Sequence, residues 1–189
     1  MRAIWRVLLV SAAIGGIVCA VIALRNPWVT FTVQSNIVLA LYYLWRLLGR
    51  ETSATVKGAV TLHLVITGVV AFFALPLPDL GGGPRHWGNL LLHCVTPVMA
   101  FVDWMAFDRA RRPGWADPLK WLAFPLAYGA LVLVAAPALP RRMAARYLHD
   151  DVLVWTDYAL AALAFSALFV VAGYALIALH RLTARGLAG

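Results

Sequence analysis

The fold is decided by a long apolar stretch with a polar stripe, residues 89–104, NLLLHCVTPVMAFVDW. Four polar side chains follow the stripe, at offsets of 4, 7 and 14 from the first: Asn89, His93, Thr96 and Asp103. At about 100° per residue, these offsets fall on one face of a helix. An imidazole inside an apolar segment of membrane length is costly, so His93 needs a hydrogen-bond partner, a water-filled cavity or a chemical role.

The composition of the whole chain is typical of an integral membrane protein. Of its 189 residues, 63% are hydrophobic and 13% are charged, and the mean hydropathy is +0.82. A soluble domain of this size does not need so large an apolar fraction. The length allows about six spans of ~20 residues with short loops, so we expect one transmembrane domain over residues 1–189.

Apolar runs and the breaks between them predict where the spans lie. The first run follows Arg2 and Arg6, exceeds the hydrophobic core of a usual signal peptide and has no good cleavage site after it, so we expect a retained helix. Segments rich in proline, glycine or arginine separate the later runs. The expected spans cover residues 4–24, 30–49, 58–77, 87–107, 118–137 and 153–179.

The distribution of charge predicts the orientation of this bundle. The formal charge is +8, and eleven of the 16 lysines and arginines fall on the side that would hold both termini. Because cytoplasmic loops are enriched in lysine and arginine, we expect an all-α, six-transmembrane-helix bundle with cytoplasmic N and C termini. The arginines lie at span ends without interleaved aromatic residues, so nucleic acid is not an expected partner.

Cysteine and histidine placement argues against a metal centre. The chain has two cysteines, Cys19 and Cys94, both inside apolar runs, and it has no CxxC or Cys/His cluster. We therefore expect neither a metal nor another cofactor. His63 has Thr67 one turn away on a span that runs in the opposite direction to that of His93, so we expect it to be a hydrogen-bonded packing residue.

The alternating direction of the spans predicts a shared site. The second, fourth and sixth spans all begin on the outer side, and His93 lies about six residues, or ~9 Å, into its span. An outward-opening cavity would then be lined by Thr32, Ser35, Asn36, Asn89, His93 and Asp157. Near the inner ends of their spans, Arg46 and Asp103 are expected to form a structural ion pair.

Three interpretations of this polar cavity remain open. A hydroxyl beside an imidazole, with a third group to fix the tautomer, can activate an oxygen nucleophile, and Asn36 or Asn89 can hold an oxyanion. The same residue types also serve as hydrogen-bonding contacts between membrane helices. The third interpretation is a pathway or binding site for a ligand or ion.

Three motifs bear on the choice: FTVQSN at 31–36, LHCVTP at 92–97 with DW at 103–104, and WLAFPLAY at 121–128. Over nearly the whole chain these resemble the bacterial Pr6Pr family of six-span membrane proteins, which look like prokaryotic relatives of the eukaryotic androgen-induced proteins. Those relatives are threonine hydrolases of lipid esters, including fatty-acid esters of hydroxy fatty acids. The resemblance implies that Thr32 is the nucleophile and His93 the general base.

The expected function is hydrolysis of a lipid ester in the bacterial inner (plasma) membrane, with the substrate entering sideways from the outer leaflet. Membrane lipids and a lipid-like small-molecule substrate or ligand are the expected partners, and the oligomeric state is left open. One alternative is a non-enzymatic lipid- or ligand-binding receptor or transporter that uses the same cavity. Another is a structural subunit of a membrane complex.

Overall fold

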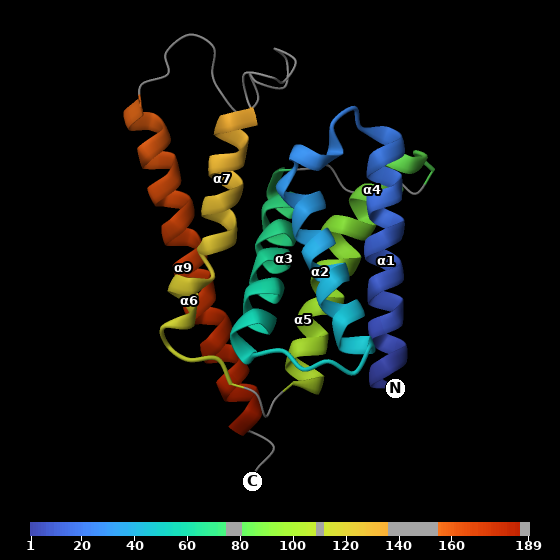
Figure 1. Cartoon of the computed structure of the whole chain (residues 1–189), viewed down its shortest axis with the longest axis vertical. Coiled ribbons are helices and arrows are strands. Elements are labelled where there is room, and N and C mark those ends of the chain that lie inside the picture. The colour runs from blue at the N-terminus through green and yellow to red at the C-terminus, as the bar shows by residue number, and fades with distance from the viewer. Residues whose placement is uncertain (75–80, 109–111, 136–154, 186–189) are drawn as a thin grey trace.

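The computed structural model describes residues 1–74, 81–108, 112–135 and 155–185, and every regular element in these ranges is helical (Figure 1). The elements in chain order are α1 (Arg2–Ala23), η1 (Pro27–Val29), α2 (Phe31–Leu47), α3 (Ala54–Ala74), α4 (Pro84–Leu90), η2 (Leu91–Val95), α5 (Thr96–Phe107), α6 (Asp117–Lys120), α7 (Ala123–Ala135) and α9 (Trp155–Arg185). The all-α expectation is confirmed for the described ranges.

Four stretches are long and apolar enough to cross a membrane, which indicates a membrane protein. They are Arg2–Ala23, Ala54–Phe73, Pro84–Phe107 and Ala162–Thr183. Two more helices along the bundle are shorter, with 17 residues in α2 and 13 in α7. The segment expected as the fifth span, 118–137, is divided near its start between α6 and α7.

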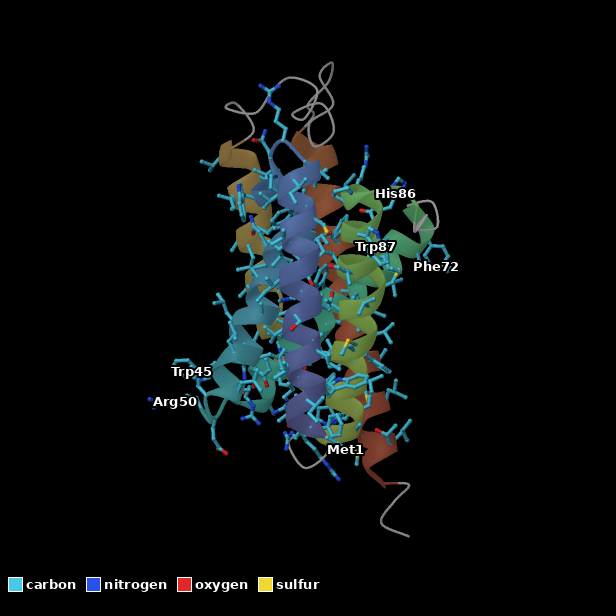
Figure 2. The ribbon with its side chains drawn as sticks, turned by 90° about the vertical axis from the view of Figure 1, so that its right-hand side faces the viewer. Met1, Trp45, Arg50, Phe72, His86 and Trp87 are labelled. Atoms are coloured by element: carbon cyan, nitrogen blue, oxygen red, sulfur yellow. The ribbon has the colours of Figure 1, made fainter. Side chains whose placement is uncertain are left out.

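Long helices reverse direction along the chain, so that the start of α1 and the end of α9 lie at the same end of the bundle (Figure 1). Helix α1 packs against α2 on one side and against α4 and α5 on the other, as Figure 2 shows from the outside of α1. Helix α9 contacts α3, α5 and α6 on the far side of α3. The helices from α1 to α5 therefore form one closely packed group.

A tryptophan at the end of α6 ties this short helix to two long ones. Trp121 is 2% exposed, and its Nε1 donates a hydrogen bond to the Thr55 carbonyl oxygen at 2.8 Å. Its ring lies directly against the backbone of Gly58 in α3, where an added Cβ would overlap the ring. An added Cβ at Gly173 of α9 would lie 3.3 Å from Trp121 Cε3, so the indole is held between two glycines.

A buried group of charges joins α1, α2, α3 and α5 at the end of the bundle that holds the N-terminus; we call it the charge cluster (Arg6, Tyr43, Lys57, Asp103 and Asp108). The Asp103 carboxylate is fully buried and accepts hydrogen bonds from Arg6 Nε at 3.1 Å and Tyr43 Oη at 2.9 Å. Lys57 Nζ forms a close ion pair with the same carboxylate. Asp103 is therefore compensated by two cations and a phenol from three other helices.

Asp108 is the second carboxylate of the cluster. Its Oδ2 lies 3.0 Å from Arg6 Nη2 and 3.5 Å from Lys57 Nζ, and its Oδ1 pairs with Arg2. Arg6, Lys57 and Asp108 are each at most 5% exposed. Because isolated charges are so costly in apolar surroundings, this sharing of partners holds the four helix ends together.

The expected pair between Arg46 and Asp103 is replaced by the charge cluster. Among the described residues Arg46 makes no ion pair, and its Nη1 donates to the Arg50 carbonyl oxygen at 3.4 Å. Arg46 lies at the expected end of the bundle, but the rotation of α2 presents Tyr43 to Asp103 instead. Arg6 and Lys57 lie near the starts of α1 and α3 at that same end and supply the positive charge.

We predict that Gly58→Ala lowers the melting temperature of the purified protein in detergent. The added methyl group overlaps the Trp121 ring, and overpacking of this kind costs about 1–3 kcal/mol. Gly129→Ala is the matched control, since nothing lies within 4 Å of a Cβ at this helical glycine and the change should be neutral or stabilising. Equal melting temperatures for Gly58→Ala and wild type would contradict this packing.

We predict that Asp103→Asn destabilises the protein by about 3–5 kcal/mol, because Arg6 and Lys57 are left buried without their shared counter-charge. Arg46→Gln should change the free energy of unfolding by only ~0.5 kcal/mol. Denaturant or thermal unfolding of both variants in the same detergent measures the difference. A larger loss of unfolding free energy in Arg46→Gln than in Asp103→Asn would contradict the pairing of Asp103 with Arg6 and Lys57.

Candidate functional site

A partly open cavity of about 100 Å³ lies where the end of α1 meets the starts of α2 and α4. This is the end of the bundle opposite the charge cluster; Figure 2 shows Met1 at one end and His86 and Trp87 near the other. The apolar lining residues are Ala20, Ala23, Leu24, Val33, Gly88 and Leu92. The polar lining residues are Thr30, Thr32, Arg85, Asn89 and His93. An apolar recess with a few convergent polar groups is typical of a small-molecule site.

A π-helical turn positions His93. The turn is η2, Leu91–Val95, and it ends with the Thr96 N–H donating to the Leu91 carbonyl oxygen, five residues back. Pro97 has no N–H to give the His93 carbonyl group, so the ordinary helical bond is missing at this point. An added Cβ at Gly68 of α3 would lie 3.1 Å from that carbonyl oxygen, so the glycine allows α3 to approach the turn. Turns of this kind occur often at functional sites.

The His93 imidazole lines the cavity with one ring nitrogen available. The ring faces the main chain of Thr67 on α3. Its Nδ1 is buried and has no hydrogen-bond partner in the part of the chain that the structure describes. An unpaired ring nitrogen can accept a proton or a hydrogen bond.

Thr32 lies in the first turn of α2 on the same cavity. The helix begins here because Thr30 is its N-cap, with Oγ1 accepting from the Val33 N–H at 3.4 Å and donating to the Pro27 carbonyl at 2.8 Å. The Thr32 side chain is half-buried and lines the cavity. Within the described ranges, no hydrogen bond of its hydroxyl group is found, in contrast to that of Thr30. The structure thus brings the Thr32 side chain and the His93 imidazole to one cavity.

Asn36 is a structural residue and does not line the cavity. It is fully buried, and its Nδ2 donates to the carbonyl oxygens of Thr32 at 2.9 Å and Leu92 at 3.4 Å. Its Oδ1 accepts from Thr96 Oγ1 at 2.7 Å. The bond to Leu92 joins α2 to the π-helical turn, the bond from Thr96 joins it to the start of α5, and the bond to Thr32 lies within α2. The amide is therefore not available for the oxyanion role considered from the sequence.

The other expected lining residues divide between the cavity and the helix interior. Asn89 lines the cavity beside Thr32 and His93. Ser35 does not, because it is 1% exposed and its Oγ donates to the Thr32 carbonyl oxygen at 3.0 Å. The Asp157 side chain lies outside the described residues. Of the two asparagines considered for the oxyanion role, Asn89 is therefore the one that lines the cavity.

Arg85 lines the cavity and was not selected from the sequence. A signal was nevertheless present, since residues 85, 89 and 93 are spaced at i, i+4 and i+8 and so share one helix face.

His63 is separate from this site and serves in packing. Its Nε2 lies 3.0 Å from the Trp121 carbonyl oxygen, and its ring centroid is 4.9 Å from that of Phe124 and 5.9 Å from that of Phe169. Thr67 Oγ1 donates to the His63 carbonyl at 2.8 Å. Among the described residues, no group of three or more histidine, cysteine and acidic side chains is placed to hold a metal ion.

We predict that Asn36→Leu lowers the stability of the protein by about 1–3 kcal/mol, because Thr96 and the Leu92 carbonyl lose a buried partner. Gln34→Leu is the control, since its single bond to the Trp28 carbonyl is exposed, and a change within ~0.5 kcal/mol is expected. Thermal unfolding in detergent measures both. If the two variants unfold alike, Asn36 is not the structural link described above.

Comparison of the chain with protein-family models, with curated proteins and with solved structures finds no match. The resemblance to the bacterial six-span family thus rests on the quoted motifs alone.

Proposed function

We propose that this protein is an intramembrane hydrolase of lipid esters, with Thr32 as nucleophile and His93 as general base. One observation carries the proposal: a threonine hydroxyl group and an imidazole from different helices line the same cavity. The His93 Nδ1 has no partner among the described residues. A weak oxygen nucleophile requires a neighbouring base of this kind, within hydrogen-bond reach once the substrate is bound.

The reaction would proceed through an acyl-threonine. Thr32 Oγ1 attacks the ester carbonyl carbon while His93 accepts the hydroxyl proton, and Asn89 donates a hydrogen bond to the developing oxyanion. The ester C–O bond then breaks, and the proton on His93 passes to the departing alcohol. Water attacks the acyl-threonine with His93 again accepting its proton. The fatty acid leaves, and the proton returns to Thr32 Oγ1.

The size of the cavity fits an ester group rather than a whole lipid. At about 100 Å³ it is smaller than an engineered protein cavity of ~150 Å³ that holds benzene. Acyl chains would therefore extend outside, along the apolar outer faces of the helices. Leu24 lines the cavity while remaining 38% exposed, and Ile22 beside it is 67% exposed, which provides such a face at the cavity edge.

We further propose that the protein is a multi-pass protein of the bacterial inner membrane, with α2 and α7 completing six spans and both termini cytoplasmic. The support is the charge distribution, since Arg2, Arg6 and Lys57 lie at the end that holds the N-terminus. In this orientation the cavity opens toward the outer leaflet, and a lipid can reach it sideways.

A non-enzymatic lipid- or ligand-binding receptor or transporter is the second candidate. It is favoured by the lining of the cavity, which includes no carboxylate among the described residues to orient the imidazole. A binding protein needs no such group, whereas most Ser-His hydrolases have one. Chemical labelling separates the two candidates.

We predict that a fluorophosphonate probe labels the purified wild-type protein and that Thr32→Ala abolishes the labelling. His93→Ala should reduce it by at least ~100-fold, the usual contribution of a positioned base. Ser35→Ala is the control for hydroxyl chemistry, and it should label like wild type because its Oγ is bonded inside α2. Unlabelled wild-type protein that also hydrolyses no p-nitrophenyl ester would favour the binding candidate.

A further inference from the structure

Arg85 is a positive charge without a counter-charge in the described structure. Its side chain is exposed and lines the cavity. Among the described residues it forms no ion pair. The carboxylates of Asp103 and Asp108 belong to the charge cluster at the opposite end, and Asp117 pairs with Lys120. Within the described ranges the guanidinium group therefore has no carboxylate partner that would compete with a ligand.

The surroundings of Arg85 define what such a ligand must look like. An arginine binds the oxygens of a phosphate or a carboxylate through paired, charge-assisted hydrogen bonds. The cavity below it is otherwise lined by apolar side chains and uncharged polar groups. Arg85 also begins the same helical run that carries Asn89 and His93, one and two turns further into the bundle. A ligand that contacts all three has an anionic end near the surface and an uncharged polar group deeper inside.

We propose that Arg85 is the specificity-determining residue for an anionic lipid, whose phosphate or carboxylate it binds at the mouth of the cavity. The lipid ester then reaches Thr32 and His93, a part of the inference that rests on the proposed function. Basic pockets between membrane helices bind lipid headgroups in this manner.

The test measures lipid binding rather than hydrolysis. Purified full-length protein in a neutral detergent is titrated with dioleoyl phosphatidate, with oleate and with dioleoylglycerol, and bound lipid is counted by native mass spectrometry. Arg85→Gln removes the charge, and Arg85→Lys keeps it without the paired donors. Arg25→Gln is the matched control, because Arg25 is an exposed arginine just after α1 that does not line the cavity.

We predict that wild type and Arg25→Gln bind phosphatidate at least about tenfold more tightly than Arg85→Gln, with Arg85→Lys intermediate. Dioleoylglycerol, which has the same acyl chains and no anionic group, should bind all four proteins equally. Arg85-dependent binding of oleate without that of phosphatidate would assign the anionic group as a carboxylate. Equal binding of both anionic lipids by wild type and Arg85→Gln would overturn the proposal.

Thr32→Ala in the same titration separates this inference from the hydrolase proposal. The variant should bind phosphatidate like wild type, since Arg85 is intact. If wild type proves unreactive toward esters while binding still depends on Arg85, the hydrolase proposal fails and the anionic-lipid site stands. If esters are cleaved but Arg85→Gln binds and cleaves the anionic and neutral lipids like wild type, the hydrolase proposal stands and the anionic-lipid site fails.

Discussion

Two carboxylates buried among apolar helices constrain the arrangement of this bundle more than any other feature. Asp103 is fully buried and Asp108 nearly so, and neither is tolerable in apolar surroundings without cations beside it. Arg6 of α1 and Lys57 of α3 both meet this requirement, because each forms ion pairs with both carboxylates. Helices α1, α3 and α5 are therefore held at fixed positions and rotations at this end.

The consequences extend to the opposite end of the bundle. Helix α1 is held at its start by Arg6, and further along it packs against α2 and α4. Ala20 in its last turns and Leu24 just after it line the cavity there. Small residues make that approach possible, since an added Cβ at Gly88 would lie 3.2 Å from Cys19 Cβ. Polar groups that serve packing, such as Asn36, are bonded inside the bundle. By contrast, two cavity-lining side chains keep polar groups without a partner among the described residues: His93 at its Nδ1 and Arg85 at its guanidinium group.

The sequence predicts how deep a side chain lies in the bundle better than it predicts which way that side chain points. Composition and apolar run length predicted helices suited to a membrane, and span direction placed Thr32, Asn89 and His93 at one depth. Rotation about each helix axis was not predicted. Ser35 and Asn36 lie at the expected depth but point into the bundle, and the π-helical turn changes the phase between Asn89 and Asp103 in a way that a uniform 100° step does not describe. The partners of Asp103 were missed for the same reason, because Arg6 and Lys57 come from helices whose rotation the pattern leaves open.

If Thr32 and His93 act together on an ester, the reaction passes through an acyl-threonine intermediate that can be trapped. Protein incubated with a short-chain activated ester and quenched in acid should carry one acyl group, mapped by peptide mass spectrometry to Thr32. The same adduct should be at least ~100-fold slower to form in His93→Ala, since the imidazole then no longer accepts the hydroxyl proton. An adduct on another residue, or one on Thr32 that forms at the same rate without His93, would contradict the account.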